Sequence, residues 1–592
     1  MSRLNVHRAV LGLLVATLSA CSTSPQQAQN AAPVMKIDKI YLGALSSAPA
    51  VTEVGDKVAM LYPTPDNRVA FRMGDKTQLL DGNLAVKGGQ FFQLNRFGKT
   101  LYALWWSHEN EKNLYCAVST DDGQTFSPTQ VINTAHGVLP PFSVVSDGGA
   151  VAGVVHMDER EPRFEVYFTR TIDGGKSWMK PDMRLDTPPK APQLSEAMFP
   201  QLVQAGKAWV VTWTDTTKED GRVVGRLLTR SSTDEGQSWS PERVIYQSPS
   251  LLTGMVTKSD GSRVVVVLQD TLKGAVAITS KDAGRSWEDL GGAPGSSNTN
   301  NSGFRLATKD GRAYVVWMAQ ASSDLQGKTS KADIITSVID LDSSKWLGQL
   351  QRIDTGKPQN QTLSLEPDIA VTGSGAVAIT WTDFRNIRPN IYLTASVDQG
   401  KSWSPPQDID APGEFSTMFS KIIPRENAIL VSYEKFPSDS RKIREAIVRE
   451  FPIGKQGGFT NIPTYPVITA AEKEAKLKTR VSDFWKLRTE GNFVATYDYF
   501  DPAFKNAFTK TEFAKHQGNF VYHTATTVLM KVEGNVATVT EKVNYEVKPT
   551  QIAGQEVKIP PTTVDIKSNW VWVYDNWYEV YQPPFGASLL QY

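Results

Sequence analysis

Two short stretches of the chain combine a carboxylate with a guanidinium. Asp158 stands two residues before Arg160, and Asp383 stands two residues before Arg385. Residues two apart on a β-strand point to the same face, so each stretch places opposite charges side by side. The charges either neutralise each other in an ion pair that fixes a loop, or they form part of a site for a charged ligand. The residues alone leave both interpretations open.

A phenol and another carboxylate, Tyr433 and Glu434, end a further apolar run. Because the two are neighbours in sequence, a strand would point them to opposite faces, which counts against their acting as a pair. Arg388 follows Arg385 closely and adds a second guanidinium to the same region.

The rest of the sequence carries few signs of cofactor chemistry. It contains no nucleotide-binding glycine loop, no serine-hydrolase elbow and no zinc-protease motif. Its six histidines and two cysteines are too few and too scattered for a metal cluster, so we expect no metal and no cofactor. Lys and Arg total 63 and Asp and Glu total 62, so no overall field favours a nucleic-acid partner.

Residues 1–21 have the features of a bacterial export signal. Arg3 and Arg8 precede an apolar stretch, residues 9–20, that is too short to cross a bilayer. The stretch ends in Leu-Ser-Ala-Cys, which resembles the lipobox of bacterial lipoproteins. That resemblance implies cleavage before Cys21 and lipidation of this residue, while a plain secretory signal that happens to contain a cysteine is the alternative.

The residues after the lipobox indicate where the protein goes. Ser22 resembles the pattern that sorts lipoproteins to the outer membrane. Residues 22–35 are small, uncharged and suited to a flexible tether. We therefore expect a lipid-anchored protein of the bacterial cell envelope, most simply at the outer membrane, with the membrane as one partner.

An eight-residue pattern recurs five times in the middle of the chain. Its third residue is Asp, its fifth is Gly and its eighth is Trp or Phe. The Asp can accept hydrogen bonds from the backbone of its own turn, and the Gly allows a conformation that a side chain would oppose. The closing aromatic ring is suited to fill the seam beside the next unit. The copies begin at Ser119, Thr171, Ser232, Ser280 and Ser396, and the stretch from Thr336 to Trp346 carries a degenerate copy.

This pattern resembles the Asp-box of the sialidase-like (BNR-repeat) β-propellers. The resemblance implies a mainly β fold in which the boxes are structural and lie on the rim away from the active site. Paired strand-like runs precede the boxes and indicate eight blades, or seven if a terminal hairpin is not a full blade. We expect the propeller over residues 36–455, with a strand at Lys36–Gly43 closing the ring against the last blade. The first runs of the pairs start near Val58, Leu101, Ala150, Ala208, Arg263, Ala313, Ala376 and Ala428.

The same resemblance implies a possible active site. Exo-α-sialidases of this family hold the substrate carboxylate with three arginines, attack with a tyrosine polarised by a glutamate, and use an aspartate as acid/base. The arginine string typical of the family's first unit is missing here. On this chain the resemblance implies a substrate clamp of Arg160, Arg385 and Arg388, with Asp158 as acid/base and Tyr433 with Glu434 as the nucleophile pair.

The composition changes after the last repeat. Residues 456–466 are rich in Gly and Pro and read as a linker. Thr469 and Glu472 then form a capping box that predicts a helix start, and helical and strand-like runs follow in an α+β order. The layout over residues 467–592 resembles the NTF2-like (cystatin-like cone) fold, a family whose cone often holds a small ligand or mediates dimers.

We therefore expect a lipid-anchored envelope propeller that binds or scaffolds a glycan or a protein partner. The alternative is an exo-α-sialidase, a glycoside hydrolase that removes terminal sialic acids.

Overall fold

A computed structural model describes residues 35–36, 48–85, 87–108, 112–161, 163–188, 196–321, 331–356, 363–410, 416–436, 445–462, 468–515, 519–552, 555–573 and 575–581. The export signal, Cys21 and residues 22–34 of the expected tether lie outside the described residues, so their roles stay predictions. The last residue of the expected tether, Met35, belongs to a strand instead.

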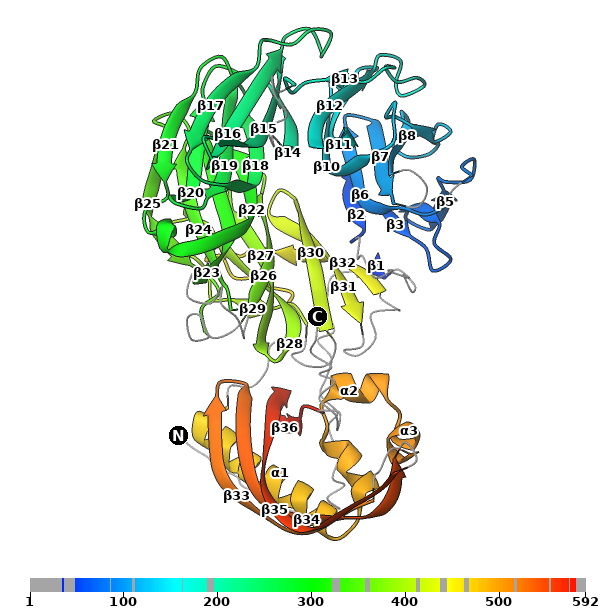
Figure 1. Ribbon diagram of the computed structural model, residues 1–592, viewed down its shortest axis with the longest axis vertical. Helices are drawn as coiled ribbons and strands as arrows, with labels where there is room; N and C mark the ends of the chain where they lie inside the picture. Colours follow the sequence, from blue (N-terminus) through cyan, green and yellow to red (C-terminus); the bar gives the residue numbers. More distant parts are fainter. Residues whose placement is uncertain are drawn as a thin grey trace, which may run out of the picture.

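The larger part of the chain is a β-propeller with eight blades (Figure 1). Each blade is one four-stranded antiparallel sheet, and neighbouring blades pack against each other through their apolar faces. The eight expected strand starts all fall at or within two residues of the second strand of a blade. The expectation of eight blades is confirmed.

The first four blades have these strands: β2 (Ala50–Val54), β3 (Lys57–Pro63), β4 (Val69–Met73), β5 (Lys76–Leu79); β6 (Gln90–Phe97), β7 (Thr100–Ser107), β8 (Asn113–Ser119), β9 (Gln130–Val131); β10 (Val138–Ser146), β11 (Ala152–Glu161), β12 (Arg163–Thr171), β13 (Met183–Arg184); β14 (Glu196–Ala205), β15 (Ala208–Glu219), β16 (Arg222–Ser232), β17 (Arg243–Ser248). The last four have these: β18 (Leu252–Asp260), β19 (Arg263–Asp270), β20 (Gly274–Ser280), β21 (Glu288–Gly292); β22 (Thr299–Lys309), β23 (Arg312–Ala321), β24 (Asp333–Asp340), β25 (Lys345–Arg352); β26 (Ser364–Val371), β27 (Val377–Asn386), β28 (Arg388–Ser396), β29 (Gln407–Asp408); β30 (Ser416–Pro424), β31 (Ala428–Phe436), β32 (Glu445–Pro452), with β1 (Met35–Lys36) as the outer strand.

The ring is closed by the start of the chain. Strand β1 pairs antiparallel with β32, with Met35 opposite Val448 and Lys36 opposite Ile447. The last blade thus takes its outermost strand from the N-terminal end. The expected strand, Lys36–Gly43, overlaps the described residues only at Lys36. This pairing covers the outer edge of β32 and joins the two ends of the propeller within one sheet.

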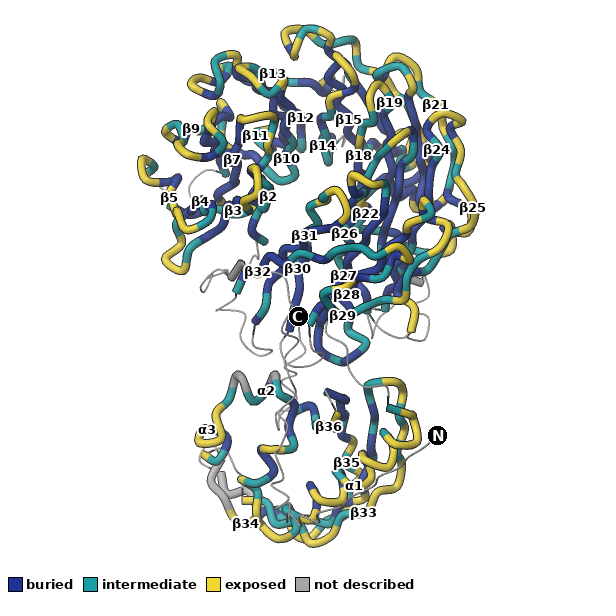
Figure 2. The backbone as a smooth tube through the Cα atoms, turned by 180° about the vertical axis from the view of Figure 1, so that it is seen from behind, coloured by how far each residue is buried: buried dark blue, intermediate teal, exposed yellow. Residues whose placement is uncertain are grey.

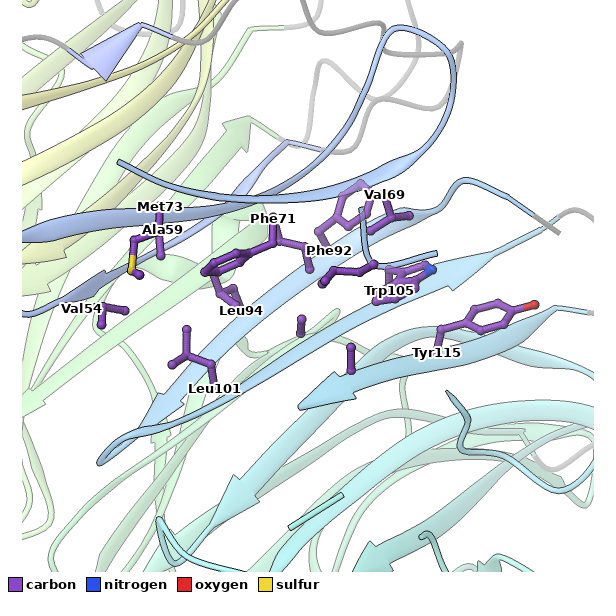
Figure 3. Packing of buried hydrophobic residues seen from close by; sticks show 14 residues of the cluster. Val54, Ala59, Val69, Phe71, Met73, Phe92, Leu94, Leu101, Trp105 and Tyr115 are labelled. Atoms are coloured by element: carbon purple, nitrogen blue, oxygen red, sulfur yellow. The ribbon is translucent and has the colours of Figure 1, made fainter. Parts of the chain in front are cut away.

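Apolar side chains between blades supply the core. Figure 3 shows the seam between the first two blades, where Phe71, Phe92, Trp105 and Tyr115 pack among smaller aliphatic residues. Large rings suit this position because radiating sheets leave a gap that must be filled. Figure 2 shows the result, with buried strands inside and exposed turns around the rim.

The Asp-boxes form nearly identical turns between the third and fourth strands of their blades. In the fourth blade, Asp234 accepts hydrogen bonds from Ser232 Oγ (2.7 Å) and from the backbone N–H of Ser238 (2.9 Å). Gly236 has φ +79°, and a Cβ on it would lie 2.5 Å from Phe168 of the third blade. The glycine is required for both the backbone conformation and the close approach.

The closing ring of each box packs against the preceding blade, not the next one. Phe126 of the second blade lies 4.7 Å from Phe71 of the first, and Trp239 of the fourth lies 5.1 Å from Phe168 of the third. The box turns back over the edge of the blade before it. As expected, the closing ring fills a seam between two blades. The prediction that this is the seam with the next blade was wrong, because the ring fills the seam with the preceding blade.

The C-terminal part combines helices with one antiparallel sheet, placed beside the propeller in Figure 1. Thr469 caps the first helix and forms the expected reciprocal capping box with Glu472. Aromatic side chains from the helices and the concave side of the sheet form a separate core. The elements are α1 (Ala470–Thr489), the 3-10 segment η3 (Phe493–Tyr499), α2 (Pro502–Ala507), α3 (Lys510–Lys515), β33 (Phe520–Glu533), β34 (Val536–Ile552), β35 (Gln555–Val573) and β36 (Asn576–Glu579). Among the described helices, none is long and apolar enough to cross a membrane.

Candidate functional site

Asp158 and Arg160 lie at the end of β11, at the opposite end of the blade from the Asp-box. Asp158 is fully buried and accepts hydrogen bonds from the backbone N–H of Arg160 (2.8 Å) and from its Nη2 (2.7 Å). The same guanidinium donates to both oxygens of Asp182 and lies 3.7 Å from the ring centre of Tyr167. Arg160 is thus held between two carboxylates and an aromatic face of its own blade.

The seventh blade repeats this arrangement. Asp383 is fully buried and accepts hydrogen bonds from the backbone N–H of Arg385 (2.8 Å) and from its Nη2 (2.7 Å). The guanidinium lies 4.2 Å from the ring centre of Tyr392 and donates to the carbonyl of Thr355. Both tyrosines follow their aspartate by nine residues.

The repetition indicates a structural device. In both blades a β-bulge follows the aspartate, and the Asp–Arg pair holds this bulge within the second strand while the guanidinium packs on a tyrosine of the third. A substrate site would not be expected to recur in the same form in two separate blades. Of the two interpretations that the sequence leaves open, this geometry favours the internal ion pair.

The structure does not bring the three arginines of the expected clamp together. Arg160 belongs to the third blade and Arg385 to the seventh, which are four blades apart in a ring of eight and therefore on opposite sides. Arg388 is fully buried, and its guanidinium contacts neither Arg160 nor Arg385 but a residue of the C-terminal part. Its Nε and Nη2 donate to the two carboxylate oxygens of Asp501 in the C-terminal part, at 2.9 and 2.8 Å.

Tyr433 and Glu434 lie side by side on β31 but face different neighbours. The Tyr433 hydroxyl donates to Asp410 at 3.1 Å, and its ring packs in the core between the last two blades. Burial, followed by the charge of Asp410, raises the pKa of this phenol well above its ordinary value. A nucleophilic phenol needs the opposite shift. Glu434 is buried opposite Met418 and Ala446.

The six residues of the expected active site therefore do not form one site. Asp158 and Arg160 lie together, Tyr433 and Glu434 are neighbours on β31, and Arg385 and Arg388 each have separate partners. The catalytic and substrate-binding roles assigned to them stay predictions that an activity assay decides. The tyrosine partners could have been found from the sequence only through the repeated spacing of nine residues from aspartate to tyrosine. The Arg388–Asp501 pair has no local sequence signal.

A second polar cluster lies inside the C-terminal part. Glu541 of β34 is fully buried, and neither of its carboxylate oxygens has a partner within hydrogen-bond geometry. Burial raises its pKa to about 7, against the smaller opposing effects of Trp485, Ser568 and Arg488. Burial also raises the pKa of the nearby Glu579 to about 7. Sequence reasoning missed this cluster because the sheet registers that bring β34, β36 and α1 together are set by long-range pairing.

The described residues contain no group of three or more His, Cys, Asp or Glu side chains that could hold a metal ion.

Comparisons with known proteins add little to this geometry. No protein-family model and no curated protein matches the chain. Among solved structures, the NanB sialidase from Streptococcus pneumoniae aligns at 10% identity and a TM-score of 0.32, covering 70% of this chain and 94% of that one. An α-L-arabinanase from Penicillium chrysogenum aligns at 15% identity and a TM-score of 0.32, covering 52% and 99%. The α-L-arabinofuranosidase Arb93a from Fusarium graminearum aligns at 12% identity and a TM-score of 0.32, covering 53% and 93%. All three TM-scores are below 0.5, so these likenesses carry no conclusion about function. The propeller fold is assigned from the order of the strands in the sheets.

Proposed function

We propose that the protein is a lipid-anchored propeller of the bacterial cell envelope that binds a glycan or a protein partner without cleaving it. The proposal is supported above all by the ion pairs that the three expected clamp arginines already make. Arg160, Arg385 and Arg388 each have their charge neutralised by a buried carboxylate of the protein itself. A side chain already engaged in this way would have to break a buried pair before it could bind substrate, which costs several kcal/mol.

The second support is the placement of the C-terminal part. Asp501 contacts the tip of the β27–β28 hairpin, and Ile387 of that hairpin packs against Val571, Val573 and Val580. The C-terminal part thus covers the end of the seventh blade where the resemblance would place a catalytic arginine. We propose that it is an NTF2-like domain that serves as a fixed second module beside the propeller.

Membrane attachment through a lipidated Cys21 belongs to the same proposal. Acyl chains on the N-terminus would hold the propeller near the membrane, with residues 22–34 as the tether before the first strand. Expression of the full precursor with Cys21→Ser tests it. We expect the wild type in the membrane fraction and the variant in the soluble envelope fraction.

The binding function is tested with the soluble chain that starts at Ser22. The labelled protein is applied to an array of neutral and acidic glycans and, in parallel, to immobilised envelope proteins. Reproducible retention of a defined group of ligands, lost after heat denaturation, supports the proposal. Turnover of a sialoside by the same preparation contradicts it and favours the exo-α-sialidase.

A further inference from the structure

Strand β1 takes the place of a fourth strand in the last blade. Like β9, β13 and β29, it is two residues long and pairs antiparallel with the middle of the third strand of its blade. In the second, third and seventh blades the chain enters this short strand shortly after an Asp-box. Strand β1 therefore has the position and the direction of an ordinary fourth strand.

The register shows toward which end of the propeller the N-terminal side of β1 is directed. Met35 lies opposite Val448 and is the residue of β1 nearer to Pro452, where β32 ends. The third strands of the boxed blades end at their Asp-boxes, and Pro452 marks the same end of the last blade. An anchor joined to β1 is therefore connected from the Asp-box end of the propeller.

The C-terminal part occupies the other end of the propeller. Arg388, at the tip of the β27–β28 hairpin, pairs with Asp501, and Ile387 beside it packs against valines of the C-terminal part. Figure 1 shows this part lying beyond the tip of that hairpin. Its first helix alone has 20 residues, a length of about 30 Å. A flat membrane could not reach that end of the seventh blade without displacing the C-terminal part.

The length of chain between Cys21 and Met35 limits how far the propeller can turn. Residues 22–34 separate the two, so their separation is at most about 50 Å, and a flexible chain of this length has a root-mean-square span of about 20 Å. A nine-residue strand such as β31 is about 30 Å long. On average a lipid anchor at Cys21 therefore lies within one blade height of β1.

The Asp-box end presents side chains that suit a layer of lipid headgroups. The second and sixth residues of all five boxes are exposed, and none of them is acidic. Four of them are basic: Lys176, Lys281, Arg285 and Lys401. A basic side chain near an anionic membrane surface contributes about 1 kcal/mol. The box aspartates are engaged within their own turns, as Asp173 is by the backbone and hydroxyl of Ser177.

Two boxes also expose an aliphatic side chain at their second position. Ile172 of the third blade is 63% exposed, and Val397 of the seventh is 47% exposed. Each stands four residues before an exposed lysine, Lys176 or Lys401. The third and seventh blades lie on opposite sides of the ring. A flat surface that touches the Asp-box end therefore meets an apolar group and a cation on both sides.

We propose that the Asp-box end of the propeller faces the membrane and contacts its lipid headgroups. This inference rests on the lipid anchor of the proposed function and gives that anchor an orientation. The exposed box lysines contact anionic headgroups, and Ile172 and Val397 contact the apolar part of the interface. The opposite end, with the C-terminal part beside it, faces away from the membrane and is left open to a partner.

Energy transfer to labelled lipids measures which end lies at the membrane. The full-length lipidated protein is reconstituted into vesicles of phosphatidylethanolamine and phosphatidylglycerol that contain an acceptor-labelled lipid. Single donor dyes are placed at Q124C or Q237C on the Asp-box end and at L251C or L272C on the opposite end, all exposed positions. The native Cys116 does not compete for the dye, because it is buried and burial raises the pKa of its thiol.

The two ends of the blades are about 30 Å apart, so the donors should differ clearly. We expect transfer from the Asp-box positions to be at least about twofold more efficient than transfer from the opposite positions. Equal transfer from both ends, or greater transfer from L251C and L272C, would overturn the inference while the lipid anchor stands. A full-length protein that does not float with the vesicles would overturn the proposed anchor and the orientation with it.

A matched pair of variants tests the contact itself. I172S, K176Q, V397S and K401Q together should lower transfer from Q237C by roughly a third, because only the tether then holds this end near the lipid. The control, L251S and L272S together, removes two exposed aliphatic side chains at the opposite end and should leave this transfer unchanged. Equal transfer in both variants would show that the box side chains do not contact the headgroups.

Discussion

The glycine of an Asp-box is subject to two separate constraints that substitution can distinguish. Gly236 has a positive φ and also lies against Phe168, whereas Gly206 has a φ of +62° with nothing within 4 Å of the position that a Cβ would take. G206A should cost about 1 kcal/mol through backbone strain alone. G236A should cost about 1–3 kcal/mol more because its methyl group must displace a buried ring.

Urea unfolding of the two variants checks this prediction. The difference between them isolates the packing of the box on the preceding blade, since both carry the same substitution in the same backbone region. Equal destabilisation of the two would mean that the close approach to Phe168 contributes nothing.

Glu541 makes the stability of the C-terminal part depend on pH. Its folded-state pKa of about 7 lies above the value of 4.5 for an exposed glutamate. Between these two pH values the folded state keeps a proton that the unfolded state releases, so stability falls as pH rises and levels off above pH 7. The total loss is up to about 3 kcal/mol. Glu579 has a similarly raised pKa and contributes a slope of its own, so E541Q should remove about half of the total slope. E533Q, at an exposed position on the same sheet, should leave the slope unchanged.

Thermal unfolding followed by tryptophan fluorescence between pH 5 and pH 8 reads out this change, because Trp485 and Trp570 lie in the same core. A slope of the same size in E541Q and wild type would show that the buried carboxylate is not its source.

At the scale of the element, the hairpin between β27 and β28 depends on one ion pair. Removing the guanidinium in R385A leaves Asp383 fully buried and without its charged partner. We expect a loss of about 3 kcal/mol in unfolding free energy. R160A should cost at least as much in the third blade, because Arg160 pairs with Asp182 as well as with Asp158. A loss of binding in either variant without a loss of stability would contradict the structural role.

Local patterns explain why most elements could be predicted. Alternating strands, the Asp-to-aromatic spacing and the capping box at Thr469 each act within about ten residues, so the sequence displays them directly. The short helix α2 shows no clear pattern in the sequence, because six residues give too little periodicity. The partners of the arginines could not be predicted, since Asp182 lies 22 residues from Arg160 and Asp501 lies 113 residues from Arg388.

At the scale of the whole molecule, the Arg388–Asp501 pair joins the two parts of the chain. Both side chains are fully buried, and Asp501 also accepts from the N–H of Phe504 at the start of α2. A double-mutant cycle with R388M and D501N separates the two roles, because asparagine still caps the helix. We expect a coupling energy of about 2–3 kcal/mol, measured by chemical unfolding.

Either single variant should also speed proteolytic cleavage within residues 456–466, while the propeller itself stays resistant. A coupling energy near zero, or unchanged cleavage, would mean that the contact does not hold the two parts together.

The central claim is that the arginines expected to clamp a substrate are structural and that the propeller binds without catalysis. Hydrolysis of a fluorogenic sialoside by the mature chain tests this most directly, with Tyr433→Phe as the partner variant. We predict no fluorophore release above background by either protein across pH 5–8. Turnover by the wild type that disappears in Tyr433→Phe, with the variant still folded, would contradict the account.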